Sequence, residues 1–202
     1  MEQIVGLKGT FNKEENVFKV SKSRSDVKIE VDGWKMPPFM GLTSWAAFTP
    51  TEDGKAMLMG DTVLFEDEVN PAMSAALDAG LEVTALHNHF FFDDPKVNFM
   101  HIGGMGDAAT LATAVKKVYD KIAEVRAAQR QPQKAFSGAK IGATNSISPE
   151  PLEAILGTKG QAKDGMFKVV ISRAANMHGT PVGNEMGVNT WAAFAGTDDE
   201  AV

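Results

Sequence analysis

Residues 40–48 read Met-Gly-Leu-Thr-Ser-Trp-Ala-Ala-Phe, and residues 186–194 read Met-Gly-Val-Asn-Thr-Trp-Ala-Ala-Phe. Matches in the same order along the chain indicate an internal repeat, which has to be recognised before a fold is predicted. We therefore expect a tandem pseudo-repeat whose second copy lacks counterparts of residues 57–147. The other matching segments are 4–9 with 155–160, and 17–20 with 166–169.

The repeat predicts residues 1–128 as a first unit, 129–147 as a linker and 148–202 as an incomplete second unit. By the same register, we expect the first helix to begin before Met1. We interpret the chain as a piece cut from a longer protein; the alternative is an evolved, permuted arrangement in which both half-units pack on one central unit. Because Val202 corresponds to Ala56, inside an expected strand, the last strand should have an uncovered edge. Such an edge predicts pairing with a strand of the first unit or with a strand of another copy of the chain, which would form a homo-oligomer.

The complete unit reads as an α+β fold, a mixed or antiparallel sheet with β-hairpins and two packed helices. Asp53-Gly54 indicates a hairpin turn, and Asn70-Pro71 is typical of a helix start. A longer helix over 107–128 has Asp107 as its cap and one apolar stripe, with Arg126 away from the stripe. The expected strands are 16–20, 26–31, 43–49, 55–64, 81–89 and 97–102, and the shorter of the two packed helices is 70–79.

Composition excludes several classes of protein. The chain has no cysteine, so it has no disulfide framework or cysteine metal site. No apolar run is long enough for a membrane span, and the first residues do not read as a signal peptide. The net charge of −6 disfavours binding to nucleic acid.

Three histidines, His87, His89 and His101, lie close together in the sequence. On a strand, His87 and His89 share a face, together with Val83 and Ala85. If 82–89 and 97–102 pair as a hairpin, Ala85 faces His101, and His101 is diagonal to His87. The three imidazoles, with Asp93 from the connecting loop, then suit a divalent metal ion, with Zn²⁺ the default.

Alternatives to the metal site remain. A His-x-His pair on a strand also occurs as a simple polar face, and a cupin shows a similar pattern. Helices flank the motif here, which disfavours a cupin. Met36, Met40, Met57 and Met59 are interpreted as core residues and not as copper ligands.

Other polar and aromatic residues have secondary assignments. Asp61 and Glu68 are candidates for orienting an imidazole, and both also suit the start of a helix. Arg24 forms a salt link or binds an anionic ligand. Trp45 and Trp191 are candidate platforms for a ligand.

Several segments resemble the LppY/LpqO family of bacterial, often exported or lipid-anchored proteins, which contain two copies of a domain of unknown function. The resemblance implies an extracytoplasmic location and carries over His87, His89, His101 and the acid before the proline, which is Asp93 here and usually Glu in the family. The matching segments are Ser23–Asp26, Gly60-Asp61, Glu68–Pro71, Val83–His89, Phe99–His101 and Gly106-Asp107.

We therefore expect a metal-binding bacterial envelope protein whose site can support metal-assisted hydrolysis. The alternative is a metal-free module that binds an envelope polymer or a small molecule. A purely structural, pairing domain is the third hypothesis. The sequence leaves the reaction and the substrate open.

Overall fold

The computed structural model describes residues 1–133 and 144–201. The chain divides at residue 136 into two compact units. Within the expected linker, residues 134–143 lie outside the described part. The α+β class is confirmed, with antiparallel sheets and helices in one chain. Among the described helices, none is long and apolar enough to cross a membrane.

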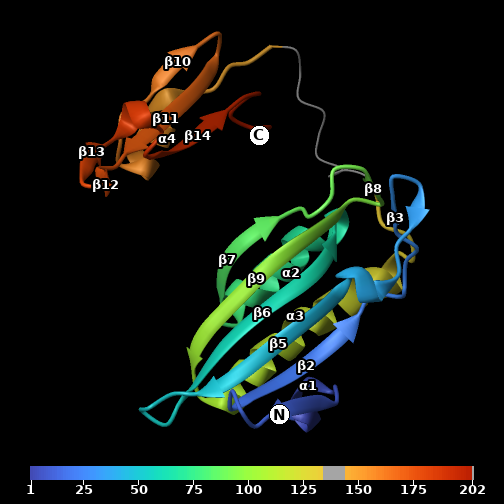
Figure 1. Ribbon diagram of the computed structural model, residues 1–202. Helices are drawn as coiled ribbons and strands as arrows, with labels where there is room; N and C mark the ends of the chain where they lie inside the picture. The colour runs from blue at the N-terminus through green and yellow to red at the C-terminus, as the bar shows by residue number, and fades with distance from the viewer. Residues whose placement is uncertain (134–143, 202) are drawn as a thin grey trace. The chain divides into compact units, whose positions relative to one another are not determined.

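The first unit is built on a six-stranded sheet in the order β1-β2-β5-β6-β9-β7 (Figure 1). Every neighbouring pair of strands in it is antiparallel. The expected hairpin turn at Asp53-Gly54 joins β5 to β6, and Gly54 adopts φ 78° there. The strands are β1 (Gly9–Asn12), β2 (Val17–Ser23), β5 (Thr43–Pro50), β6 (Ala56–Phe65), β7 (Glu82–His87) and β9 (Val97–Gly106).

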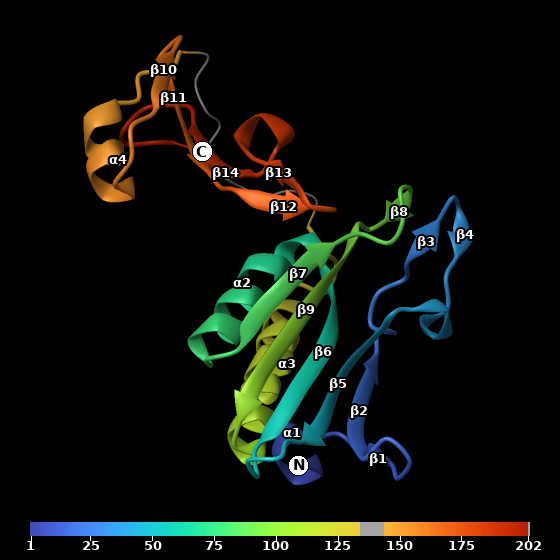
Figure 2. The ribbon, with the colours of Figure 1, turned by 60° about the vertical axis from the view of Figure 1, so that its left-hand side comes forward.

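Two helices, α2 (Glu66–Asp78) and α3 (Ala108–Ala128), pack against each other and cover one face of this sheet (Figure 2). Asp107 caps α3 by accepting a hydrogen bond from the Thr110 amide at 2.9 Å. The main core lies between these helices and the sheet, and a short helix α1 (Glu2–Val5) packs beside α3. The predicted stripe on α3 is buried at Leu111, Val115, Val118 and Ile122.

A second apolar cluster covers part of the opposite face of the sheet. Residues between β2 and β5 supply Val27, Ile29, Met36 and Leu42, which pack against Val63, Phe65, Val97 and Phe99. This segment contains β3 (Glu30–Val31), β4 (Trp34–Lys35) and a short 3-10 helix η1 (Pro38–Met40), and β3 also pairs with β8 (Asp93–Asp94). The rest of this face is called the open face below, and it includes Trp45, Met57, Met59, Asp61 and His101.

The predicted start of the helix over 70–79, which is α2, was wrong. The helix begins at Glu66 and not at Asn70, so Pro71 lies inside it. The Glu68 carboxylate reaches back to accept the Phe65 amide at 2.9 Å, which satisfies one of the free donors at the helix end. Three acidic residues in the first turn also favour this start through the helix dipole.

The second unit contains a three-stranded sheet in the order β10-β11-β14. Its small core is formed by Ile147, Phe167 and Val169. In the described part of the chain, no strand pairs with the outer edge of β14. The elements are α4 (Pro149–Leu156), β10 (Gln161–Lys163), β11 (Met166–Ser172), β12 (Ala175–Met177), β13 (Thr180–Val182), η2 (Asn184–Met186) and β14 (Asn189–Phe194).

The two units share internal details, although the duplication itself stays a prediction. Phe18 pairs with Phe48 in the β2–β5 ladder, as Phe167 pairs with Phe194 in the β11–β14 ladder. In both ladders the pairing continues without a shift over six residue pairs. The amide of Gly9 donates to Glu2 at 2.7 Å, and the amide of Gly160 donates to Glu153 at 3.0 Å.

These two glycines give a test of the shared design. A Cβ atom on Gly160 would lie 2.4 Å from the Phe167 ring and 2.6 Å from the Lys168 carbonyl oxygen, and one on Gly9 would lie 2.2 Å from Phe18. Because such overpacking costs about 1–3 kcal/mol, we expect Gly9→Ala to destabilise the first unit and Gly160→Ala the second. Urea unfolding followed by histidine NMR signals separates the units, since only His178 lies in the second.

Gly106→Ala is the matched control, because a Cβ atom there would meet nothing within 4 Å. Unchanged stability of both units in the Gly9 and Gly160 variants would contradict the expectation.

Candidate functional site

Strands β7 and β9 bring two of the three histidines together on the open face. Ala85 pairs with His101 and His87 pairs with Phe99, as the sequence predicted. The two side chains therefore stand on the same face of neighbouring strands, diagonal to each other. The Nε2 atoms of His87 and His101 lie 3.0 Å apart, and the ring centroids are 4.8 Å apart with the rings perpendicular.

A bulge at Thr84 sets this arrangement. Val83 pairs with Ile102 and Ala85 pairs with His101, so Thr84 is an extra residue in β7. Val83 consequently packs against the main core, and Ala85 faces the other way. The prediction that Val83 shares a face with His87 was therefore wrong.

Asp61 is the carboxylate that the fold places beside the histidines. It lies on β6 directly opposite His101, and Trp45 lies opposite Asp61 on the next strand, β5. Asp61 Oδ2 is 3.8 Å from His101 Nε2. Its other oxygen, Oδ1, is buried and has no hydrogen-bond partner among the described residues. Asp61 thus has acceptor capacity left for a ligand at this point.

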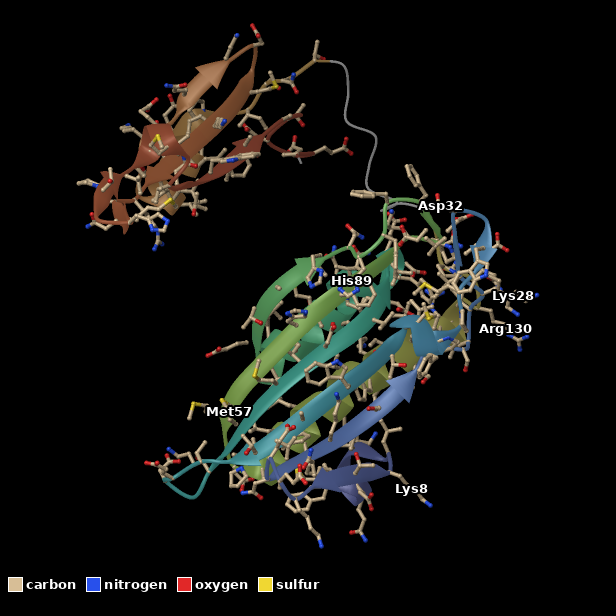
Figure 3. The ribbon with its side chains drawn as sticks, viewed as in Figure 1. Lys8, Lys28, Asp32, Met57, His89 and Arg130 are labelled. Atoms are coloured by element: carbon tan, nitrogen blue, oxygen red, sulfur yellow. The ribbon has the colours of Figure 1, made fainter. Side chains whose placement is uncertain are left out.

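His89, labelled in Figure 3, follows the end of β7. Its ring lies flat on the Phe99 ring. The ring centroids of His89 and Phe99 are 3.6 Å apart and their planes differ by 8°. The His87 ring stacks at 4.9 Å on the same imidazole. Burial first, and then the charge of His87, lower the pKa of His89 below its ordinary 6.5. The stack therefore favours a neutral imidazole, which is the form that binds metals.

Asp93, the expected fourth ligand, has a different role. Its Oδ1 forms an ion pair with Lys96, and its Oδ2 accepts the Val97 amide at 2.7 Å. Both oxygens are thus used to hold the turn between β8 and β9. The Asp93 carboxylate, which was expected to reach the ion, instead binds a backbone amide and a lysine of its own loop.

Glu68 and Arg24 belong to a buried ion cluster on the other side of β6. Glu68 is 0% exposed, and its carboxylate binds Arg24 through two bonds of 2.7 and 2.9 Å. Arg24 also donates two bonds to Asp26 and one to the Val63 carbonyl. Glu68 is therefore committed to arginines and not to an imidazole, and every nitrogen of the Arg24 guanidinium already has an acceptor.

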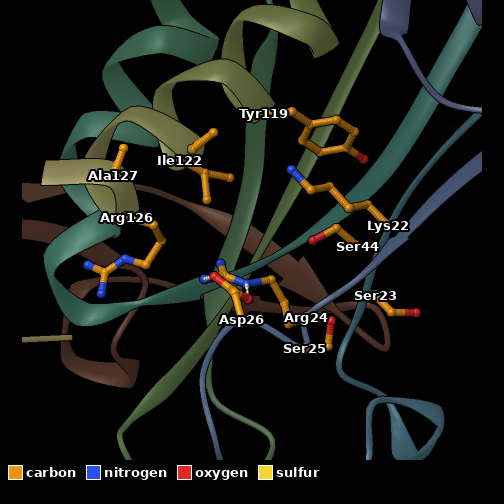
Figure 4. A pocket seen from close by; sticks show the side chains of 11 residues that line it. Lys22, Ser23, Arg24, Ser25, Asp26, Ser44, Tyr119, Ile122, Arg126 and Ala127 are labelled. Atoms are coloured by element: carbon orange, nitrogen blue, oxygen red, sulfur yellow. Dashed lines mark hydrogen bonds and ion pairs between the residues drawn. The ribbon is translucent and has the colours of Figure 1, made fainter. Parts of the chain in front are cut away.

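Burial alone would lower the pKa of Arg24, but hydrogen bonds and charge from Glu68 and Asp26 outweigh it and raise the pKa above its ordinary value. Figure 4 shows the bonds between Arg24 and Asp26. Burial alone would raise the pKa of Asp26, but the bonds from Arg24 lower it below 3.8. Both residues are therefore charged at neutral pH.

Arg126 completes the cluster, although its sequence position suggested an exposed side chain. Its Nε lies 2.8 Å from Glu68 Oε1 in an ion pair without hydrogen-bond alignment, and its Nη2 binds Asp67. The side chain is 9% exposed. The helical stripe gave no signal for it, because a buried arginine is recognised only through partners that are distant in sequence.

Each of the two tryptophans predicted as ligand platforms is in contact with a lysine. Lys19 Nζ lies 4.3 Å above the Trp45 ring, and Lys168 Nζ lies 4.8 Å above the Trp191 ring in the second unit. One face of each proposed aromatic platform is therefore already in contact with an ammonium group.

The interpretation of the methionines as core residues is right for Met36 alone. Met40, Met57 and Met59 are exposed, and the last two stand on the open face on the same side of β6 as Asp61. Met57 is labelled in Figure 3. The alternation along β6 did not predict the exposure of Met57 and Met59, because both were assumed to lie on a covered face of the sheet.

Within residues 1–133 and 144–201, no group of three or more His, Asp or Glu side chains is placed to hold a metal ion as it stands. The site consists of a histidine pair, an adjacent carboxylate and a third imidazole held on Phe99. It can share a proton between the two Nε2 atoms, or chelate an ion after small side-chain rotations.

Comparison with known proteins gives a family and no activity. No curated protein and no solved structure matches the chain. A family model described as Domain of Unknown Function (DUF1259) matches residues 1–121 and 150–202. Since these residues make up most of the chain, the protein belongs to the family described as Domain of Unknown Function (DUF1259).

Proposed function

We propose that the protein binds a divalent metal ion between His87 and His101, with Asp61 as the third ligand. The distance of 3.0 Å between the two Nε2 atoms carries this proposal. Two nitrogens that bind one tetrahedral Zn²⁺ at about 2.0–2.1 Å are themselves about 3.3–3.4 Å apart. The pair therefore has nearly the spacing of a chelate.

Asp61 and His89 support the same proposal. Asp61 Oδ2 is 3.8 Å from His101 Nε2, so a rotation of the carboxylate brings an oxygen to an ion held by the pair. The unpartnered Asp61 Oδ1 gains an acceptor role only when a cation or donor arrives. His89 reaches such an ion only by leaving its stack on Phe99, so it is a fourth ligand or a neutral neighbour.

A bound Zn²⁺ would supply Lewis acidity and acidify water at an open coordination position, which suits hydrolysis. We also propose, on the segments quoted above, that the family corresponds to LppY/LpqO and that the protein acts outside the cytoplasm. These proposals rest on sequence resemblance.

Isothermal titration with Zn²⁺ of tag-free, EDTA-treated protein tests the site. We expect one ion per chain. His101→Ala and Asp61→Asn each change a proposed ligand, so both should weaken binding by more than the roughly 10–100-fold that loss of a ligand's hydrogen-bond partner causes. His178→Ala, in the second unit, is the matched control and should bind as the original protein does.

Two results would overturn the proposal. One is the absence of binding by the original protein, which would favour a metal-free function. The other is an unchanged affinity in both His87→Ala and His101→Ala, which would place the ion elsewhere.

A further inference from the structure

Three methionines, called the methionine cluster below, stand together on the open face of the sheet. Met57 on β6 lies directly opposite Met105 on β9, and Met59 is the next residue on the same face of β6. The side chains of Met57, Met59 and Met105 are 38%, 61% and 66% exposed. Figure 3 labels Met57 at the end of the sheet near the turn between β5 and β6. Three thioethers are therefore accessible from solvent at this end of the face.

The strand register brings the three sulfur atoms within reach of one another. Opposite residues on antiparallel strands have Cβ atoms about 4.5–5.5 Å apart, and diagonal residues are about 7–8 Å apart. Met57 and Met105 form a pair of the first kind, and Met59 and Met105 form a pair of the second. Because methionine is unbranched and flexible, each sulfur atom can move toward a common point above the sheet.

Gly103 leaves room for this movement. It lies between His101 and Met105 on the same face of β9, directly opposite Met59. Among the described residues, a Cβ atom on Gly103 would meet only the Leu58 carbonyl oxygen, at 3.6 Å. The open face therefore has a gap beside Met59, into which this side chain can turn toward Met105.

The two faces of β6 and β9 carry different apolar residues. On the core face beside the methionine cluster, the strands carry Ala56, Leu58 and Ile102. On the open face they carry methionine, although β-branched and aromatic side chains are the ones that favour strands. An apolar contact surface does not require sulfur. The use of thioethers on the exposed side therefore points to the sulfur atom as the functional group.

The chemistry of these ligands and the charge around them suit a soft cation. Thioether sulfur is a soft ligand that suits Cu(I), whereas carboxylates and carbonyls suit Mg²⁺ and Ca²⁺. The chain has no cysteine, so methionine is its source of sulfur ligands. Asp61 follows Met59 on the same face of β6, and Glu82 on β7 lies opposite Gly103. The two carboxylates add negative charge that attracts a cation.

We propose that Met57, Met59 and Met105 together bind one Cu(I) ion through their sulfur atoms. Copper was set aside for the first two because they were interpreted as core residues, and their exposure removes that reason. The ion lies at the surface, where it can exchange with ligands in solution. Because the three sulfur ligands are separate from the histidines and Asp61, this proposal is independent of the divalent-metal site.

Competition for Cu(I) between the protein and bicinchoninate, under anaerobic conditions, tests the proposal. Cu(I) is added as its acetonitrile complex to tag-free, EDTA-treated protein. We expect the triple variant Met57→Leu, Met59→Leu and Met105→Leu to bind one Cu(I) ion per chain fewer than the original protein. Each single leucine variant should weaken binding of this ion at least about tenfold. Exchange of methionine for leucine nearly conserves volume, so these variants should fold normally.

NMR of protein with ¹³C-methyl methionine identifies the ligands directly. We expect Cu(I) to shift the methyl signals of Met57, Met59 and Met105, which the single variants assign. The signals of buried Met36 and Met100 should stay in place, since neither sulfur atom is accessible.

The matched control is a second triple variant, Met166→Leu, Met177→Leu and Met186→Leu. These methionines are 38%, 62% and 73% exposed, and they lie in three different elements of the second unit. This variant should bind Cu(I) as the original protein does, and so should His87→Ala combined with His101→Ala. The proposal is overturned if the two triple variants bind equally many Cu(I) ions, if the methyl signals of the methionine cluster do not shift, or if the histidine variant loses the ion.

Discussion

Replacing Glu68 with alanine is expected to remove about 3–5 kcal/mol from the free energy of unfolding of the first unit. The Glu68 carboxylate is fully buried, and it neutralises Arg24 and lies 2.8 Å from the Nε of Arg126. Its removal leaves two buried guanidinium groups short of one negative charge. It also frees the Phe65 amide at the start of α2.

Urea unfolding followed by the NMR signals of His87, His89 and His101 measures this loss, and the His178 signal should not change. The matched control is Glu124→Ala, which breaks an exposed ion pair of 2.7 Å with Lys121. Exposed pairs contribute about 0–1 kcal/mol, so the control should be nearly neutral. A loss below about 1 kcal/mol for Glu68→Ala would show that the cluster relaxes around the missing carboxylate.

Phe99→Ala is expected to destabilise the first unit by a similar amount, about 3–5 kcal/mol, because it empties the centre of the second apolar cluster. Phe99 is 1% exposed and is also the surface on which His89 lies. Phe91→Ala is the control, since Phe91 is 91% exposed and should contribute less than about 0.5 kcal/mol.

The Phe99→Ala variant also tests why the pKa of His89 is lowered. The pKa of His89 lies below 6.5, so the folded protein binds this proton less well than the unfolded chain does. The contribution of the neutral stack is therefore present above pH 6.5 and declines as the pH falls below it. In Phe99→Ala, an NMR titration should show the pKa of His89 rising toward 6.5, and an unchanged pKa would contradict the stacking explanation.

The sequence predicted the contacts that follow from alternation along a strand. The facing of Ala85 with His101, and the diagonal placement of His87, required only a hairpin and a period of two. Strands 43–49 and 55–64 and helix 107–128 were located within one or two residues for the same reason. Regular elements with one buried face have strong periodicity, and that signal is local.

The features that the sequence did not place concern interactions that close over long sequence separations or within irregular loops, and the ligand role of Asp93 stays a prediction. Asn70-Pro71 predicted a helix start, but the helix begins one turn earlier, at Glu66. Glu68, in this earlier turn, is held by ion pairs with Arg24 and Arg126. Asp93 had the composition of a ligand, whereas the loop uses it to bind Lys96 and Val97. Asp61 was assigned a supporting role, because its position opposite His101 depends on β6 joining β9, a pairing that no local pattern specifies.

The extra residue at Thr84 makes β7 tolerant of both side-chain change and deletion at this one position. Before Thr84, the odd-numbered residue Val83 faces the core that the helices cover. After it, the odd-numbered residues Ala85 and His87 point to the open face. Because Thr84 is the extra residue, deleting it would leave Val83 opposite Ile102 and Ala85 opposite His101 in a regular ladder, with His87 still on the open face. Because the Thr84 side chain is exposed, substituting it leaves Val83 and His87 on the faces that they occupy now. Relatives that retain the histidine pair should therefore vary freely in the identity of this residue, and some should lack it.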